Sequence, residues 1–288
     1  SSGDYNTALG TNALYANTSG IDNTGIGWKS LYSNTTGSYN TASGSASLFS
    51  NTSGTRNTAS GYVALYNNTT GSNNSASGAF SLYNNTTGAY NTALGSGSLY
   101  TNTTGSNNSA IGYNALYSNT TGSRNTALGY YALNANTTGY DNSALGYYSM
   151  KSTTTGYMNS AFGKQSLELN TEGLQNSAFG YQSLGSNTTG DANVALGMNS
   201  LYKNATGNYN SAVGVGAGFN AAGSSNVFIG YKAGYASTGS NQLYISSYDQ
   251  SGSAERNLIT GNFATGALSL GQTSGTVSIL NDADIDGT

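Results

Sequence analysis

Apolar and polar residues along this chain follow one pattern that repeats every 17 residues. Counted from a leading Asn, Gly recurs at position five, Leu at position nine, Asn at position twelve and Gly at position fifteen. We call each repeat a coil and number the coils from the first leading Asn. The leading residues are Asn6, Asn23, Asn40, Asn57, Asn74, Asn91, Asn108, Asn125, Asn142, Asn159, Asn176, Asn193 and Asn210. A fixed short period is typical of solenoids, in which each repeat stacks on the next.

Each coil contains two strand signals and one turn signal. Positions two to four, as in Thr126–Leu128, are a short run between Asn and Gly, which predicts a strand. Positions eight to ten, as in Ala115–Tyr117, predict a second strand with Leu inside. Positions twelve to fifteen read N-T-T-G and predict a turn, begun by the Asn side chain and ended by a Gly at positive φ.

Alternation along a strand assigns the faces of positions two to four. Positions two and four share one face, and Val194 and Val227 at position two indicate that this face can be buried. Position three is Ala in nearly every coil, with Gly25 as an exception. A face of Ala lets another backbone come close, so we expect it to suit a contact between protomers.

These signals predict an all-β chain: a parallel β-solenoid, or β-roll, of about fourteen 17-residue coils. One coil cannot offset the roughly 1.5 kcal/mol per residue of ordering entropy, but coils stacked at ~4.8 Å bury Leu over Leu. A helical solenoid needs about 33 residues per repeat and is excluded. The chain contains no Pro, which would remove a ladder hydrogen bond, and few charges, which would repel when stacked.

The regular pattern predicts two regions. Residues 1–240 form the repeat shaft, and residues 241–288 form an aperiodic cap or transition region, after which we expect a further segment. Alternating apolar residues predict strands in this second region, at Leu243 and Ile245, Leu258, Phe263, Leu268 and Leu270, and Val277 and Ile279.

Composition excludes most catalytic chemistry. The 288 residues include no His and no Cys, which removes Ser-His-Asp and Cys-His catalysis, haem ligation and imidazole or thiolate metal sites. Asp282, Asp284 and Asp286 match only the start of an EF-hand loop. Glu168 and Glu172 lie four positions apart, but nothing around them supplies a glycosidase site. We therefore predict no enzyme, no cofactor and no metal.

Charge and hydropathy limit the partners. The net charge is −3, with eight scattered Lys and Arg residues, so no nucleic-acid partner is expected. No run of about 18 apolar residues exists, so no membrane insertion is expected.

Aromatic residues dominate position ten, and stacked at one strand spacing they predict a ring ladder or a sugar-binding stripe. The structural interpretation is favoured, because stacked aromatic pairs are themselves stabilising. These residues are Tyr15, Tyr32, Phe49, Tyr66, Tyr83, Tyr100, Tyr117, Tyr202 and Phe219. Thr rows in the turns leave ice binding as a minor alternative.

The candidate binding residues lie in coils eight to ten, where the position-ten ladder is interrupted. Tyr side chains appear there at positions seven and sixteen, and charges gather in a chain that otherwise has few. One interpretation is a change of packing, with an ion pair between Lys151 and Glu168 on adjacent coils. The other is a shallow site for a saccharide or a protein. The residues of this candidate site are Tyr131, Tyr148, Lys151, Tyr157, Lys164 and Glu168.

The tags NTALG, NSAIG, NVALG and NVFIG resemble the repeat motif of trimeric autotransporter adhesin heads. The longer unit NTALGYYALNANTTGYDNSALG is similar to the 17-residue arrays of phage and bacterial tail-fibre-domain proteins. This resemblance covers nearly the whole chain and implies a left-handed β-roll that assembles as a homotrimer. It further implies an extracellular place, on a virion tail fibre or on the bacterial cell surface.

Two functions follow as expectations. The favoured one is a structural and adhesive shaft of a trimeric fibre, which holds a host- or surface-binding tip away from the particle. The alternative is an adhesin head whose own coils bind a receptor, either a host-surface glycan or a protein.

Overall fold

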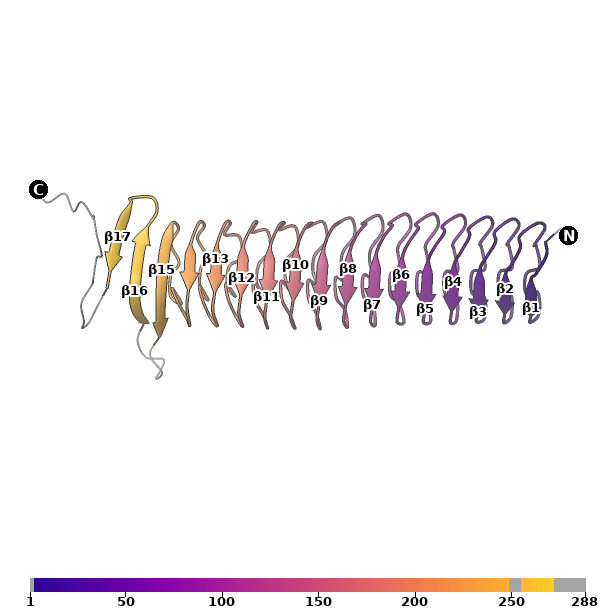
Figure 1. The fold of residues 1–288 in the computed structure, drawn as a ribbon, viewed down its shortest axis with the longest axis horizontal. Coiled ribbons are helices and arrows are strands. Elements are labelled where there is room, and N and C mark those ends of the chain that lie inside the picture. The colour runs from indigo at the N-terminus through magenta and orange to yellow at the C-terminus, as the bar shows by residue number, and fades with distance from the viewer. Residues whose placement is uncertain (1–2, 249–254, 272–288) are drawn as a thin grey trace, which may run out of the picture.

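The computed structural model describes residues 3–248 and 255–271, which form a straight rod of stacked coils (Figure 1). Each coil contributes one three-residue strand, and the strands of successive coils pair in parallel with a register of one repeat, as in Thr126 with Ser143. The predicted parallel β-solenoid is confirmed. The coil strands are β1 (Thr7–Leu9), β2 (Thr24–Ile26), β3 (Thr41–Ser43), β4 (Thr58–Ser60), β5 (Ser75–Ser77), β6 (Thr92–Leu94), β7 (Ser109–Ile111), β8 (Thr126–Leu128), β9 (Ser143–Leu145), β10 (Ser160–Phe162), β11 (Ser177–Phe179), β12 (Val194–Leu196), β13 (Ser211–Val213) and β14 (Val227–Ile229).

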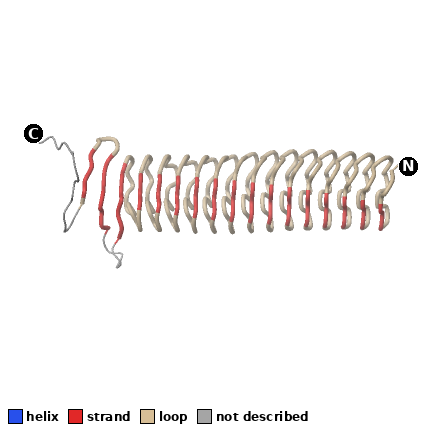
Figure 2. Tube along the Cα trace, viewed as in Figure 1, coloured by secondary structure: helices blue, strands red, loops and turns tan. Residues whose placement is uncertain are grey.

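Three longer strands follow the coils and continue the same sheet. β15 (Gln242–Tyr248) pairs in parallel with β14, whereas β16 (Glu255–Asn262) and β17 (Ala267–Leu270) are antiparallel (Figure 1). In Figure 2 these three strands are the long red segments beyond the coils. Within the described ranges there is no helix that is long and apolar enough to cross a membrane. The strand predicted around Val277 and Ile279, like the acidic triplet at 282–286, lies outside the described residues.

The core holds the side chains of positions three and nine. Ala127 of β8 and Leu133 of the same coil are both fully buried, and their counterparts are buried in the same way except in the first coil, where Ala8 at the end of the stack is exposed. The predicted faces were therefore wrong, because position three points into its own coil and positions two and four point outward. Val194 at position two, for example, is 43% exposed. A small residue suits position three, since a Cβ at Gly25 would lie 3.0 Å from Ser30 Oγ of the same coil. The buried Ala side chains offer no surface to a second protomer.

The second predicted strand was also wrong. Residues at positions seven and nine adopt the left-handed region, with φ of 51° at Asn114 and 52° at Leu116, so positions eight to ten form turns. These turns still join the coils, since the Leu116 amide donates to the Ala132 carbonyl at 3.0 Å. Leu at position nine is interior, as predicted, although no strand presents it.

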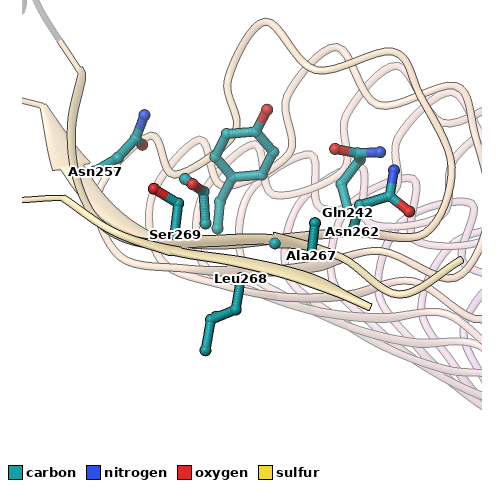
Figure 3. Close-up of a pocket in the computed structure, with 9 residues that line it drawn as sticks. Gln242, Asn257, Asn262, Ala267, Leu268 and Ser269 are labelled. Atoms are coloured by element: carbon teal, nitrogen blue, oxygen red, sulfur yellow. The ribbon is translucent and has the colours of Figure 1, made fainter. Parts of the chain in front are cut away.

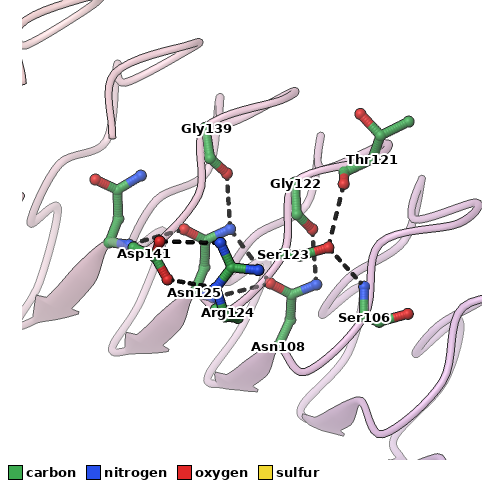
Figure 4. A network of polar contacts seen from close by, with 10 residues as sticks. Ser106, Asn108, Thr121, Gly122, Ser123, Arg124, Asn125, Gly139 and Asp141 are labelled. Atoms are coloured by element: carbon green, nitrogen blue, oxygen red, sulfur yellow. Dashed lines mark hydrogen bonds and ion pairs between the residues drawn. The ribbon is translucent and has the colours of Figure 1, made fainter. Parts of the chain in front are cut away.

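Two columns of buried Asn fill the other half of the interior. Asn119 at position twelve donates from Nδ2 to Asn102 Oδ1 at 2.7 Å and to the Gly122 carbonyl at 2.9 Å. Asn108 at position one donates to the same Gly122 carbonyl at 2.9 Å, and its Oδ1 accepts the backbone amide of Asn125 at 3.0 Å (Figure 4). The amides of Asn108 and Asn119 thus donate and accept hydrogen bonds within their own coil and along the rod axis, which satisfies them without water.

Close approach explains the Gly at position fifteen. Its φ lies outside the left-handed region predicted for it, so backbone conformation is not the reason. A Cβ on Gly122 would meet Asn119 Oδ1 and the carbonyl oxygen of Gly139 in the next coil. Only Gly leaves room for both Asn columns to reach this carbonyl.

The regular core ends at β14, where position three is large and position nine is Gly. Phe228 in β14 replaces the usual Ala at position three and is fully buried. The facing position nine is Gly218 in one coil and Gly234 in the next, and a Cβ on either would collide with the Phe228 ring.

One coil breaks the position-twelve column. Thr153 stands where Asn is expected, and its Oγ1 and the Asn136 Oδ1 are buried without hydrogen-bond partners. We expect Thr153→Asn to raise the free energy of unfolding by about 1–3 kcal/mol, because it removes the orphaned hydroxyl and supplies an Nδ2 that donates to Asn136 Oδ1. Thermal melting measures this gain. Asn119→Thr is the matched control. It creates the same break where the position-twelve Asn column is intact, and it should lower the melting temperature. A lower melting temperature for Thr153→Asn would contradict the column.

The corrected faces yield a second prediction. Leu116→Ala removes a fully buried side chain and should cost about 2–5 kcal/mol of stability. Leu128→Ala makes the same chemical change at position four, where Leu is 41% exposed, and should cost less than about 1 kcal/mol. Chemical denaturation of the two variants compares them. Equal losses would mean that positions four and nine are not on opposite sides of the coil wall.

Candidate functional site

A group of five tyrosine rings lies on the surface of coils seven to nine; we call it the tyrosine cluster. Its members come from the neighbouring positions six and seven, so they form two adjacent columns. In the position-six column the ring centroids of Tyr113 and Tyr130, and of Tyr130 and Tyr147, are 5.4 Å apart. The position-seven rings pack against them, with Tyr131 4.6 Å from Tyr130 and Tyr148 4.0 Å from Tyr147.

Two Lys side chains of the predicted site lie beside the tyrosine cluster. The Lys151 ammonium is 4.4 Å from the Tyr148 ring centroid. The Lys164 ammonium is 5.7 Å from Tyr147 and 5.8 Å from Tyr181, so it bridges the cluster to the next tyrosine of the column. The negative ring face attracts such cations, and Lys164 is exposed while Lys151 is half-buried.

The predicted ion pair between Lys151 and Glu168 was wrong. No ion pair joins these two residues, both of which belong to the described part of the chain. Glu168 instead accepts a hydrogen bond from Gln165 Nε2 at 2.9 Å. Lys151 is drawn to the Tyr148 face, because position ten lies next to the position-seven column.

Tyr157 does not join the other predicted residues. Its ring stacks on Tyr140 at 4.7 Å, in the position-sixteen column. Tyr140 in turn lies 5.7 Å from Arg124, which forms a two-point ion pair with Asp141 at 2.7 and 3.0 Å (Figure 4). Arg124 holds the pKa of Asp141 below its usual range through this hydrogen bond. The candidate site thus divides into the tyrosine cluster with its two Lys residues and a separate position-sixteen patch.

Sequence reasoning missed the position-six tyrosines. Tyr113, Tyr130 and Tyr147 carry the largest exposed ring surface of the cluster, each more than two-fifths exposed. A column count at position six would have found them, since Tyr62, Tyr181 and Tyr231 share that position.

The position-ten ladder forms as predicted. Rings from Tyr15 to Tyr117 stack coil on coil at centroid distances of 4.9–5.3 Å. Because each ring covers the face of the next, this ladder presents mainly ring edges to solvent and acts as structure.

Position four forms an exposed apolar stripe along the coil strands. Its side chains point away from the core, and no charged residue occurs at this position from β1 to β14. The exposed members are Leu9, Ile26, Leu94, Ile111, Leu128, Leu145, Phe162, Phe179, Leu196, Val213 and Ile229. Ser43, Ser60 and Ser77 interrupt this stripe, which is unbroken from Leu94 in β6 to Ile229 in β14. An exposed apolar patch of this kind marks an interaction surface.

A polar groove of about 370 Å³ lies at the end of the stack, between β15 and the β16–β17 hairpin. The Tyr244 ring and three side-chain amides surround it, from Gln242, Asn257 and Asn262 (Figure 3). Its chemistry is neutral hydrogen bonding. Among the described residues, no three Asp or Glu side chains gather in a way that would hold a metal ion.

Comparison with known proteins gives no relative, because no protein-family model, no curated protein and no solved structure matches this chain.

The tyrosine cluster has one electrostatic signature that can be measured. A side-chain hydrogen bond to Tyr148 raises the pKa of Tyr147 to about 12, and burial and nearby charges add to this effect. Tyr148→Phe should return the Tyr147 pKa toward its ordinary value of 10.0, since the bond is lost. Alkaline titration of ¹³C-labelled tyrosines by NMR follows the shift, with Tyr147→Phe assigning the signal. Tyr131→Phe is the control, because it leaves the hydrogen bond in place. An unchanged Tyr147 pKa in Tyr148→Phe would contradict the geometry.

Proposed function

We propose that this chain is the shaft of a homotrimeric extracellular fibre, carried on a virion tail or on a bacterial cell surface, which holds a binding tip away from its anchor. The observation that carries the proposal is the pair of buried Asn columns. They join each coil to the next by side chain as well as by backbone. A rod built in this way resists bending and offers few loops to proteases, which are the properties that a shaft needs.

The apolar stripe at position four supports self-association. Uncharged residues repeat at each strand spacing, all of them apolar from Leu94 to Ile229, so a second copy of the chain would present the same periodic surface. Burial of side chains such as Leu128 and Leu145, about two-fifths exposed in the single chain, would remove apolar area from water. The left-handed trimer implied by the family resemblance belongs to this proposal. In this proposal the position-four stripe, and not the Ala face at position three, makes the contact between protomers.

Oligomeric state tests the proposal. We expect the purified chain to have the mass of a trimer by light scattering at micromolar concentration. The double variant Leu128→Glu with Leu145→Glu should dissociate it, because charge on the stripe would be buried without a partner.

The matched control is Thr138→Glu with Thr155→Glu. It places the same two charges on the same two coils, at exposed turn positions. This control should remain trimeric. A monomeric wild-type chain, or equal dissociation of both double variants, would overturn the trimer and the stripe as its contact.

A further inference from the structure

A second hollow lies on the shaft itself, at coils five to seven. Its volume is about 420 Å³, and its floor is the backbone of Gly97 at position seven. We call it the Gly97 pocket. The residues that line it are Phe80, Ser96, Gly97, Tyr100, Tyr113, Asn114 and Tyr117.

The pocket exists because one side chain is missing from a column. Position seven holds Phe80 in the preceding coil and Asn114 in the following coil, so these two face each other across Gly97 over about two strand spacings, ~9.6 Å. Gly97 has φ of 68°, a region that Phe80 at 60° and Asn114 at 51° also occupy. The backbone therefore does not require Gly here. Gly97 leaves space that the Asn114 side chain partly enters, since its Oδ1 lies where a Cβ on residue 97 would be, and the hollow lies beside it.

Aromatic rings form the walls of this space. Tyr100 and Tyr117 of the position-ten ladder stack 4.9 Å apart on one side, and Tyr113 of the tyrosine cluster stands on the other. Phe80 is tilted by 53° to Tyr100, so its ring is not part of the ladder. With no side chain at position 97, the Phe80 ring has no neighbour in the next coil of its own column.

Polar groups are present without charge. The Asn114 backbone carbonyl accepts a hydrogen bond from Asn134 Nδ2 at 3.0 Å. Within residues 3–248 and 255–271, the Asn114 side-chain amide and the Ser96 hydroxyl make no hydrogen bond. The tyrosine hydroxyls add donors and acceptors, and the lining contains no Asp, Glu, Lys or Arg side chain.

We propose that the Gly97 pocket binds one pyranose residue of a neutral carbohydrate. A pyranose has apolar C–H faces that pack against aromatic rings, and equatorial hydroxyls that pair with an amide and with phenol groups. A charged sugar finds no counter-charge in this lining. The inference does not rest on the shaft function, because a single chain holds the whole pocket, and sugar binding and oligomeric state are measured separately.

Titration of the purified chain with neutral methyl pyranosides tests the inference. The probes are the methyl glycosides of glucose, galactose, mannose and N-acetylglucosamine, followed by saturation-transfer NMR and calorimetry up to about 10 mM. A ligand with about thirteen non-hydrogen atoms is expected to bind a shallow site with a Kd of about 1 mM.

Gly97→Asn is the variant that blocks the pocket. The same position is Asn at Asn12, Asn114 and Asn199, all with positive φ, so the fold accepts this residue. Asn114 Oδ1 must move aside, since it lies where the new Cβ would be. Tyr113→Ala removes a wall, and Tyr181→Ala is its control, because Tyr181 occupies the same position six in coil eleven and is similarly exposed.

We expect at least one probe to bind, with affinity lowered about tenfold or more by Gly97→Asn and by Tyr113→Ala and unchanged by Tyr181→Ala. Melting temperatures confirm that all variants are folded. The melting temperature of the Gly97→Asn variant should not be lower than that of the wild-type chain. No binding of any probe at about 10 mM, or binding that survives Gly97→Asn, would overturn the inference.

Discussion

The buried asparagine amide is the interaction on which the rest of the structure depends. A 17-residue coil turns so tightly that several backbone carbonyls face inward, where an apolar side chain would leave them unpaired. Asn119 and Asn108 solve this together, since one primary amide donates to its own coil and exchanges hydrogen bonds with its neighbours. This solution works only if each coil presents the same group at the same height, which requires a fixed repeat length.

The period alone predicted the stack, the interior Leu column and the ring ladder, because in-register stacking brings equal positions together whatever the shape of the coil. It did not predict the shape. Alternation assigned positions two to four to the wrong sides, and positions eight to ten were assigned to a strand. The reason is the left-handed backbone at residues such as Asn114 and Leu116, a conformation that local propensity does not predict for Leu.

The same limit governed the candidate site. Tyr131, Tyr148 and Lys151 could be grouped from sequence, since they lie on adjacent coils at positions that turned out to be neighbours. Tyr157 could not be separated from them, and Tyr130 could not be added, until the path of the coil showed which positions share a face. The sequence shows which residues stack along the rod, because they hold the same position in successive coils. Which different positions lie side by side around the coil depends on the geometry of its turns.

Phe228 affects how the chain can find its register while folding. Coils with Ala at position three and Leu at position nine are interchangeable in the core, so a chain could omit one repeat as a loop and lose little packing. Phe228 fits only where position nine is Gly on both sides, as at Gly218 and Gly234. No other pair of coils can therefore replace the last coils in this packing. A stack that grows from them starts with each coil in its correct register.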